Sequence, residues 1–355
     1  MSRHRRTPLV IASLITAVAL VAGCGQDDTA SGGTATTADT APVTVRVGYF
    51  PNLTHAPALV AVHDGLFAKA LPKNATLETK TFNAGPEAVE AIFAGTLDVA
   101  YLGPNPAINA FQKSKGDAVR VISGAASGGA FFVVQPGITT AADLKGTTVA
   151  DPKLGGTQDV ALRTWLAGQG LATDTSGGGD VHIAPQENAD TLAAFTAKTI
   201  SGAWVPEPWA TRLVQEGGGK ILVDEATLWP GGKYPTTVIV ASTPFLKAHP
   251  AIVTALLGAN IAAIDAIGKN PAAAQVAVNA EIEKVTGKKL KDGVITAAWK
   301  NLTFTSDPVA SAFKKAAADA KAVGLLQSTD LNGLFDLSAL NRALGTAGQP
   351  TVPAS

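Results

Sequence analysis

Three loops in the sequence combine proline, glycine and asparagine at points where a strand pattern gives way to a helical pattern. They are residues 48–58 (Gly-Tyr-Phe-Pro-Asn-Leu-Thr-His-Ala-Pro-Ala), 82–87 (Phe-Asn-Ala-Gly-Pro-Glu) and 102–107 (Leu-Gly-Pro-Asn-Pro-Ala). Proline in the first helical turn costs no hydrogen bond, because the first N–H groups of a helix have no acceptor within it. Those N–H groups and the positive end of the helix dipole favour a bound anion. The loops therefore predict an anion site made of uncharged donors.

No Arg or Lys lies inside any of the candidate loops. The nearest cationic residues are Arg46 and Lys153. Arg46 alternates with Val45 and Val47, so it should project from the opposite side of its strand, and Lys153 should remain in solvent. We expect helix N-termini, including those at Asn105 and Thr157, to hold the acidic group without an arginine clamp.

The elements that position these loops alternate between strands and helices. This order predicts an α/β fold with mainly parallel sheets covered by helices on both faces. The predicted strands are 43–49, 76–82, 98–101, 119–123, 131–135, 147–150, 181–183, 202–205, 221–223 and 237–241, and the predicted helices are 58–71, 87–94, 105–113, 158–167, 189–197 and 206–215.

The two α/β series predict two similar lobes, the second inserted in the first. Residues 43–136 and 237–345 should form lobe 1, with a helical, alanine-rich end, and residues 137–236 should form lobe 2. Crossings near 131–137 and 236–241 should join them, residues 124–130 should be a loop, and residues 346–355 a flexible C-terminal tail. Ligands of open α/β sheets bind beyond the carboxyl ends of the strands, which here would face the cleft between the lobes.

The N-terminus has the features of a bacterial secretion signal. Three arginines precede an uncharged apolar stretch from Leu9 to Ala22, which is short for a membrane span. Val21-Ala22-Gly23-Cys24 resembles a lipobox, so residues 1–23 would be the signal peptide and Cys24 the lipidated first residue, anchored in the membrane. Residues 24–42 contain no large apolar side chain and predict a flexible tether. An ordinary secreted protein is the alternative.

Composition argues against a nucleic-acid-binding protein and against a fold held by disulfides. The formal net charge is 0, and removal of Arg3, Arg5 and Arg6 with the signal leaves a mildly acidic chain without a basic stripe, which argues against nucleic acid as a partner. Cys24 is the single cysteine, so no intramolecular disulfide can form. Stability must therefore come from burial of apolar side chains.

Five sequence stretches together carry a resemblance to a known family. They are residues 93–100 (Phe-Ala-Gly-Thr-Leu-Asp-Val-Ala), 126–129 (Ala-Ser-Gly-Gly), 143–146 (Asp-Leu-Lys-Gly), 154–159 (Leu-Gly-Gly-Thr-Gln-Asp) and 204–209 (Trp-Val-Pro-Glu-Pro-Trp). These stretches resemble the sulfonate, nitrate and bicarbonate group of ABC substrate-binding proteins, and the resemblance covers nearly all of the mature chain. It implies a periplasmic-binding-protein-like type II fold, with two lobes that close around a cleft by a hinge.

The resemblance also implies a function and partners. The chain would be a monomeric lipoprotein, held on the extracytoplasmic face of the cell membrane, that captures a small anionic solute and delivers it to an ABC permease with a separate ATPase. An aliphatic sulfonate is the favoured solute. Nitrate, bicarbonate, taurine and a thiamine-precursor-like heterocycle remain alternatives, as does a lipoprotein that senses its ligand. No cofactor or metal is implied.

Ligand contacts are carried over from the family onto matching positions. In lobe 1 they are Asn52, Thr54, His55, Gly103, Pro104, Asn105, Ser127 and Gly128, and in lobe 2 they are Gly156, Thr157, Gln158, Trp204 and Glu207. The donors suit a sulfonate, and Trp204 would cover an alkyl group. His55 has the alternative role of capping or packing a helix start, and Glu207 the alternative of a structural role. Trp209 is predicted to be a core residue.

An enzyme is the competing class. The chain has no cysteine-rich motif of the kind used in thiamine-pyrimidine synthesis, no Gly-x-Ser-x-Gly motif and no P-loop, and its histidines are not spaced as a metal cluster. Residues 311–314 spell Ser-x-x-Lys, but without the companion motifs this is a chance match inside an alanine-rich helix. We therefore predict no catalytic residues.

Overall fold

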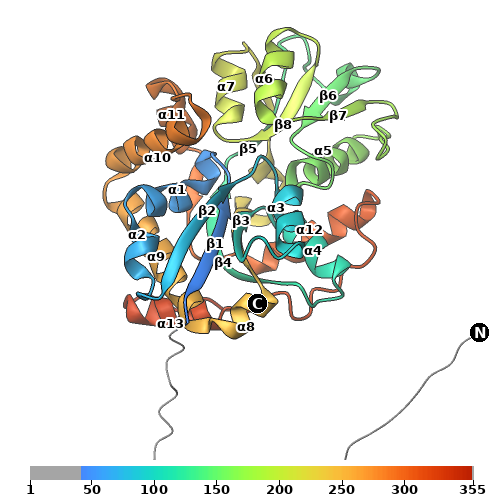
Figure 1. The fold of residues 1–355 in the computed structure, drawn as a ribbon. Coiled ribbons are helices and arrows are strands. Elements are labelled where there is room, and N and C mark those ends of the chain that lie inside the picture. The colour runs from blue at the N-terminus through green and yellow to red at the C-terminus, as the bar shows by residue number, and fades with distance from the viewer. Residues whose placement is uncertain (1–40, 354–355) are drawn as a thin grey trace, which may run out of the picture. The chain divides into compact units, whose positions relative to one another are not determined.

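The structure is a computed structural model that describes residues 41–353. The predicted signal peptide, Cys24 and the tether up to residue 40 lie outside the described residues. The described chain has two lobes, each built on its own sheet, and Figure 1 shows the second above the first.

The first lobe contains a mixed six-stranded sheet in the order β11-β4-β10-β3-β1-β2. Strand β1 runs parallel to β2 and β3, whereas β10 is antiparallel to β3 and β4, and β11 is antiparallel to β4. The strands are β1 (Val43–Tyr49), β2 (Ala75–Thr81), β3 (Val99–Leu102), β4 (Val119–Gly128), β10 (Pro235–Ser242) and β11 (Leu302–Phe304).

Helices cover both faces of this sheet. On one face α1, α9 and α10 pack against β1, where Val45 and Val47 are buried, and on the other α3, α4 and α12 pack around Leu102 and Val119. The helices are α1 (Ala56–His63), α2 (Leu66–Ala70), α3 (Gly85–Phe93), α4 (Pro104–Lys113), α8 (Thr243–Ala248), α9 (Pro250–Lys269), α10 (Pro271–Thr286), α11 (Asp292–Trp299), α12 (Ala310–Ala322) and α13 (Ser338–Thr346), with the 3-10 turn η1 (Leu53–His55) before α1.

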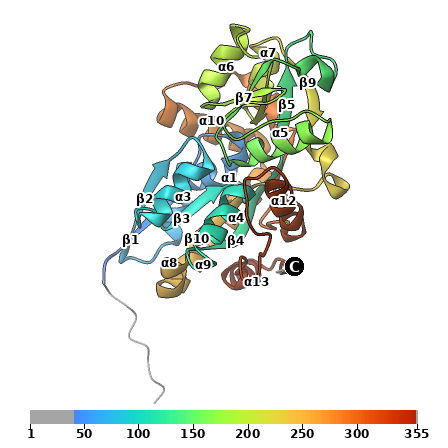
Figure 2. The same ribbon diagram turned by 90° about the vertical axis from the view of Figure 1, so that its right-hand side faces the viewer.

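The second lobe contains a mixed five-stranded sheet in the order β7-β6-β8-β5-β9. Strand β6 is parallel to β7 and β8, and β5 is antiparallel to β8 and β9. The elements are β5 (Ala130–Val134), β6 (Thr148–Asp151), β7 (His182–Pro185), β8 (Gly202–Pro206), β9 (Lys220–Asp224), α5 (Thr157–Gly168), α6 (Asn188–Thr196) and α7 (Trp209–Gln215), with 3-10 turns η2 (Ala141–Leu144), η3 (Glu225–Leu228) and η4 (Pro230–Gly232). Figure 2 shows α5 beside α4 and α12 of the first lobe.

Several sequence expectations are corrected by this topology. The sheets are mixed rather than mainly parallel, because β5 and β10, which follow the connections between the lobes, run against their neighbours. The predicted helix 58–71 is broken at Gly65, whose φ of 66° lies in the left-handed region. Residues 124–128 continue β4 instead of forming a loop.

The boundary between the lobes also lies earlier than predicted. Residues up to 136 were expected in lobe 1, but β5 pairs with β8 and β9 in the centre of the second sheet. The chain crosses at Gly128 and Gly129, whose φ values of 79° and 74° are ones that residues with a side chain rarely adopt.

Tyr234 ties the two connections together. It lies just before β10 on the return connection, where its carbonyl oxygen accepts from Ser127 Oγ at 2.6 Å and its hydroxyl oxygen accepts from the Ala130 N–H at 3.1 Å. Tyr234 thus bonds to the residues before and after the glycines where the chain first crosses between the lobes. The two connections between the lobes therefore lie side by side.

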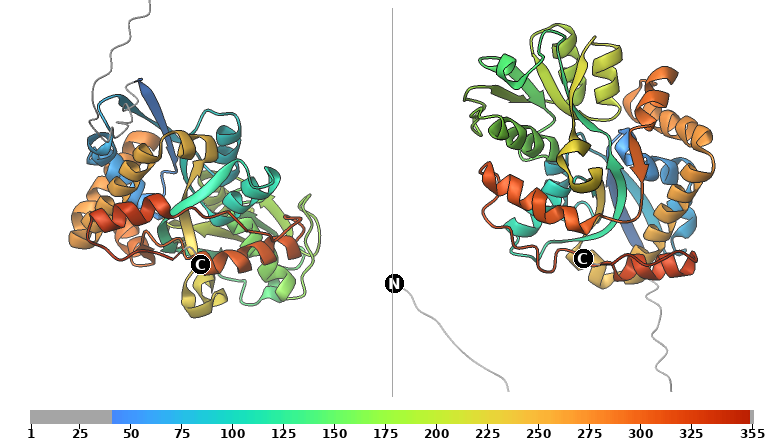
Figure 3. Two further views of the ribbon diagram at one scale, coloured as in Figure 1. Left: turned by 90° about the horizontal axis from the view of Figure 1, so that it is seen from below. Right: turned by 180° about the vertical axis from the view of Figure 1, so that it is seen from behind.

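The C-terminal segment is held rather than loose. Gln349 donates to the carboxylate of Asp265 on α9 at 2.9 Å, and the Val352 N–H donates to Asn341 Oδ1 on α13 at 2.8 Å. The prediction of a flexible tail from residue 346 is therefore wrong for residues 346–353. Figure 3 shows α13 at the end of the first lobe remote from the second.

Helix α9 is long and apolar enough to cross a membrane by length and composition, and it is the one such helix among residues 41–353. Half of its most apolar stretch is buried inside the fold. Leu256, Leu257 and Ile261 pack in the first-lobe core, which accounts for its apolar character.

Candidate functional site

A small cavity of about 40 Å³ lies between the lobes, and the N-termini of four helices and the 3-10 turn η1 reach it. From the first lobe come the starts of η1, α3 and α4, and from the second come those of α5 and α6. The lining residues at these starts are Asn52, Thr54, His55, Ala84, Gly85, Gly103, Gly156, Thr157, Gln158 and Asn188. The site thus lies where loops leave the carboxyl ends of strands, as in other open α/β sheets.

The starts of these helices are not capped by their own side chains. The N-cap residues Asn52, Ala84, Gly103, Gly156 and Glu187 make no side-chain capping hydrogen bond. Proline occupies the first turn of both α3 and α4. The first N–H groups of a helix have no acceptor within it, so those that proline does not remove are available to a solute in the cavity.

Two buried polar side chains at the cavity have an atom with no partner. Thr157 is 6% exposed and Asn188 is 7% exposed. Thr157 Oγ1 and Asn188 Oδ1 make no hydrogen bond to the described part of the chain. A buried polar atom without a protein partner is costly, so a solute that bonds to these two atoms would be favoured.

His55 supplies a neutral donor. Its Nδ1 accepts from the Phe50 N–H at 3.3 Å, so the proton lies on Nε2, and the two rings are in contact at a tilt of 32°, with centroids 4.2 Å apart. Burial lowers the pKa of His55 to about 3. The imidazole is therefore neutral at physiological pH, and it both packs at the helix start, as in one of the two predicted alternatives, and lines the cavity.

Three bridges join the lobes around the cavity. Trp209 Nε1 donates to Asn52 Oδ1 at 2.9 Å, and Asn83 Nδ2 donates to Glu187 Oε1 at 2.9 Å. Lys153 Nζ pairs with Glu87 Oε1 at 3.0 Å. The structure therefore shows the lobes closed against each other.

One of these bridges corrects a sequence expectation. Trp209 was predicted in the core, but its half-buried indole lies between the lobes with the Arg212 guanidinium 4.7 Å from its ring. Lys153 was predicted to stay in solvent, and its side chain is exposed; it also lines the cavity, with its ammonium paired to Glu87. Lys153 therefore brings no unpaired positive charge to the cavity.

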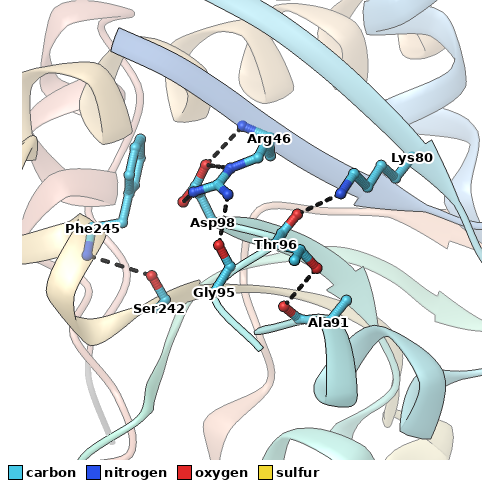
Figure 4. A network of polar contacts seen from close by, with 8 residues as sticks. All are labelled: Arg46, Lys80, Ala91, Gly95, Thr96, Asp98, Ser242 and Phe245. Carbon is cyan, nitrogen blue, oxygen red and sulfur yellow. Dashed lines mark hydrogen bonds and ion pairs between the residues drawn. The ribbon is translucent and has the colours of Figure 1, made fainter. Parts of the chain in front are cut away.

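Arg46 is engaged elsewhere. Its guanidinium donates to both carboxylate oxygens of Asp98, at 2.9 and 2.8 Å, and to the carbonyl of Gly95 (Figure 4). Arg46 is not among the residues that line the cavity. This agrees with its predicted projection away from the site.

Four predicted site residues are near the cleft but do not line the cavity. Asn105 Nδ2 donates to the Ala316 carbonyl at 3.1 Å, and Ser127 Oγ donates to the Tyr234 carbonyl. The Gly128 carbonyl accepts from Thr236 Oγ1. Pro104 is buried at the first position of α4 and does not line the cavity.

Trp204 is a core residue and does not reach the cavity. Side chains alternate along β8, so Ala203 and Val205 face one core and Trp204 faces the other, where it stacks on Phe132 with centroids 5.5 Å apart. Its Nε1 donates to Glu225 Oε2 at 2.7 Å. The prediction that Trp204 covers an alkyl group is therefore wrong in this structure.

Glu207 stabilises the junction between the lobes. Its carboxylate accepts from the Thr211 N–H and hydroxyl at 3.1 and 2.8 Å, and from Asn301 Nδ2 of the first lobe at 2.7 Å. Burial raises the pKa of Glu207. These contacts fit the structural alternative, and Glu207 does not line the cavity.

The site also contains residues that the sequence prediction missed. Asn83, Gly85, Asn188 and Thr236 line the cavity but were not among the candidates. Asn83 and Gly85 belong to the 82–87 loop, which was identified by its proline and glycine. Asn188 begins a helix after a strand, so the same junction pattern would have found it.

The fold and site together define a class. Two α/β lobes joined by adjacent strands, with a cavity between them walled by helix N-termini, form a periplasmic-binding-protein fold. The alkanesulfonate-binding protein SsuA from Xanthomonas axonopodis pv. citri, solved bound to MOPS, superposes with a TM-score of 0.68 at 22% identity, covering 82% of this chain and 96% of that one.

Sequence comparison places the chain more narrowly. The profile of the NMT1-like family matches residues 38–281, and the chain belongs to that family. A protein of Brucella abortus (strain 2308), named only as a binding protein, is 27% identical over 199 residues, which is 56% of this chain and 59% of that protein. The taurine-binding periplasmic protein of Escherichia coli (strain K12) is 28% identical over 218 residues, which is 61% of this chain and 64% of that protein. The chain thus spans less than two thirds of the length of these relatives.

Proposed function

We propose that this protein is the extracytoplasmic solute-binding component of an ABC importer, and that its solute is a small organic anion, an aliphatic sulfonate. The observation that carries the proposal is the convergence of four helix N-termini, two from each lobe, on one cavity. A second, separate support is that the relatives whose names describe a ligand include binding proteins for taurine and aliphatic sulfonates.

A sulfonate suits this set of donors. It stays ionised throughout the physiological pH range and accepts hydrogen bonds through three oxygens. Backbone N–H groups, the Thr157 hydroxyl and His55 Nε2–H would donate to it from opposite lobes. Because donors come from both lobes, solute would favour the closed state over the open one, and a permease could distinguish the two.

A second candidate is an inorganic anion such as nitrate or bicarbonate. The observation that favours it is the size of the cavity, about 40 Å³. By the usual requirement of roughly 10–15 Å³ for one water, this is room for about three water-sized groups. Such a volume fits an acidic head group, or a whole small anion.

Calorimetric titration of the purified protein separates the candidates. We expect ethanesulfonate and taurine to bind and nitrate, bicarbonate and a thiamine-pyrimidine precursor to bind at least tenfold more weakly. Tight binding of nitrate or bicarbonate alone would favour the second candidate. Binding of the neutral heterocycle alone would contradict both.

The remaining parts of the proposal concern placement and partners. Cys24 would carry the lipid that holds the protein on the outer face of the cell membrane, and the tether would let the monomeric binding domain reach the permease, which works with a separate ATPase. We expect Cys24→Ala to appear in the soluble fraction with an unchanged melting temperature. Retention of that variant in washed membranes would contradict the anchor.

Growth on ethanesulfonate as sulfur source, compared with and without the gene, separates import from a sensory role.

A further inference from the structure

A second, larger space adjoins the cavity. It is a groove of about 1020 Å³ between α6 and α7 of the second lobe and the segment from α10 to α11 of the first. Figure 1 shows these elements facing each other along one side of the molecule. The volume lies at the upper end of what drug-sized ligands occupy, which is about 300 to 1,000 Å³. The groove is therefore larger than nitrate, taurine or a short alkanesulfonate requires.

The groove and the cavity meet at a shared wall. Phe50, Asn52, Asn83 and Asn188 line both spaces. Because the cavity has room for an acidic head group and little else, any organic substituent on that head must leave it. The groove is the larger space on the other side of this wall.

Two bridges between the lobes occupy this wall. Asn52 accepts from Trp209, and Asn83 donates to Glu187, with all four residues lining the groove. The Trp209 ring is half-buried, and Leu192, Pro208 and Leu290 add apolar surface near it. A flat apolar body that left the cavity would meet the Trp209 ring here, together with the Arg212 guanidinium that lies 4.7 Å from the ring centroid.

The far side of the groove carries uncompensated positive charge. Lys288, Lys289 and Lys291 are exposed on the segment between α10 and α11 and form no ion pair within residues 41–353. Among the other charged residues that line the groove, Arg212 pairs with Glu216, and Glu187 accepts from the neutral Asn83 amide and keeps its negative charge. The groove therefore combines an apolar surface with three exposed lysines and the Glu187 carboxylate.

We propose that the groove holds the body of the solute, and that the preferred solute is an organic anion with two acidic groups. One group lies in the cavity among the helix N-termini, a flat apolar body lies against Trp209, and the second group faces Lys288, Lys289 and Lys291. This inference rests on the proposed function, since it takes the first acidic group to be bound in the cavity.

The test compares three probes by calorimetry on the purified protein: ethanesulfonate, naphthalene-2-sulfonate and naphthalene-2,6-disulfonate. The first probe fills the cavity alone, the second adds the flat body, and the third adds the second charge. We expect each addition to tighten binding, the second charge by at least tenfold at low salt. High salt should reduce that last gain most, because the lysines are exposed.

A triple variant tests the lysines directly. In Lys288→Ala/Lys289→Ala/Lys291→Ala we expect the disulfonate to bind no tighter than the monosulfonate, with ethanesulfonate affinity changed less than twofold. The matched control replaces three exposed lysines elsewhere, Lys73→Ala/Lys314→Ala/Lys321→Ala, and should retain the full disulfonate preference. This control removes the same net charge, so a difference between the two variants depends on where the lysines lie.

The outcomes distinguish the two proposals. If ethanesulfonate binds but the naphthalene probes bind no tighter, or if the control variant loses the disulfonate preference as fully as the groove variant, the groove inference is wrong and the proposed function stands. If none of the three probes binds, the proposed function fails. Binding of both naphthalene probes without ethanesulfonate would place them outside the cavity, which also overturns the inference.

Discussion

Gly103 and Thr157 face each other across the cleft so closely that a Cβ on Gly103 would overlap Thr157 Oγ1. Gly103 has a φ of −73°, so its backbone conformation does not require glycine. What requires glycine is space, because the N-terminus of α4 in one lobe meets the N-terminus of α5 in the other. The closed state therefore depends on the absence of one side chain.

We predict that Gly103→Ala hinders closure and weakens sulfonate binding at least tenfold, with the melting temperature of the ligand-free protein nearly unchanged. An open protein has no clash to relieve, so the cost appears only when the lobes close. Calorimetry and thermal unfolding measure the two quantities. Gly137→Ala is the control, because a Cβ there meets no atom. Equal affinity of Gly103→Ala and wild type would contradict the role of this contact.

Thr157 provides the second prediction. Thr157→Val removes the buried hydroxyl but keeps a branched side chain, so we expect binding to weaken by about 1–3 kcal/mol through loss of a donor to a charged group. Thr157→Ser keeps the hydroxyl and should bind within about threefold of wild type. Stability should not fall in the valine variant, because Oγ1 has no partner among the described residues in the absence of ligand. A valine variant that binds as tightly as wild type would show that Oγ1 makes no contact with the solute.

Arg46 provides a prediction of the opposite kind. Asp98 is buried, with its side chain 7% exposed, and Arg46→Ala would leave its carboxylate with much less compensation. We expect the free energy of unfolding to drop by about 1–3 kcal/mol in urea titrations. Sulfonate affinity should change less than twofold, because Arg46 does not line the cavity. Loss of binding by the folded variant would overturn the uncharged-donor description of the site.

His55 predicts a pH dependence of stability. Its pKa is lowered to about 3 in the folded state, compared with about 6.5 in an unfolded chain. The unfolded state therefore binds more protons between these values, and stability is lost as the pH falls below about 6.5. At pH 4.5 the loss from this residue is about 2–3 kcal/mol, since one pKa unit is worth about 1.4 kcal/mol.

The measurement for His55 is urea unfolding at pH 7.5, 6.0 and 4.5 for wild type and His55→Asn. Asparagine does not titrate, and its side-chain oxygen can replace Nδ1 as the acceptor for Phe50. We expect the stability of wild type to fall relative to the variant as the pH is lowered. Parallel curves for the two proteins would show that the buried imidazole does not control this dependence.

Local patterns in the sequence were sufficient for the elements around the site. Strand β1 begins and ends at the predicted residues, and the starts of α3, α4 and α5 lie within two residues of the predicted ones. Period-two alternation, proline in the first helical turn and glycine before it act over a few residues. They do not depend on what packs against them.

The same reasoning failed where position depends on distant parts of the chain. Trp204 was assigned to the site because of its motif, but the face of β8 on which it lies is set by packing against Phe132. Trp209 was assigned to the core, yet its partner Asn52 lies 157 positions away in the chain. Neither contact leaves a signal in local sequence.

Sequence patterns alone predicted the α/β class, strand-to-helix loops without Arg or Lys, and the projection of Arg46 away from those loops. Each of these predictions follows from short-range geometry: side-chain alternation, helix N–H groups without acceptors, and the fixed φ of proline. The packing of the two lobes sets which loops converge, pairs Lys153 with Glu87 and places a lysine-bearing groove beside the cavity. Those features arise when two lobes close on each other, and the distance between residues far apart in sequence is fixed by the packing of the whole fold.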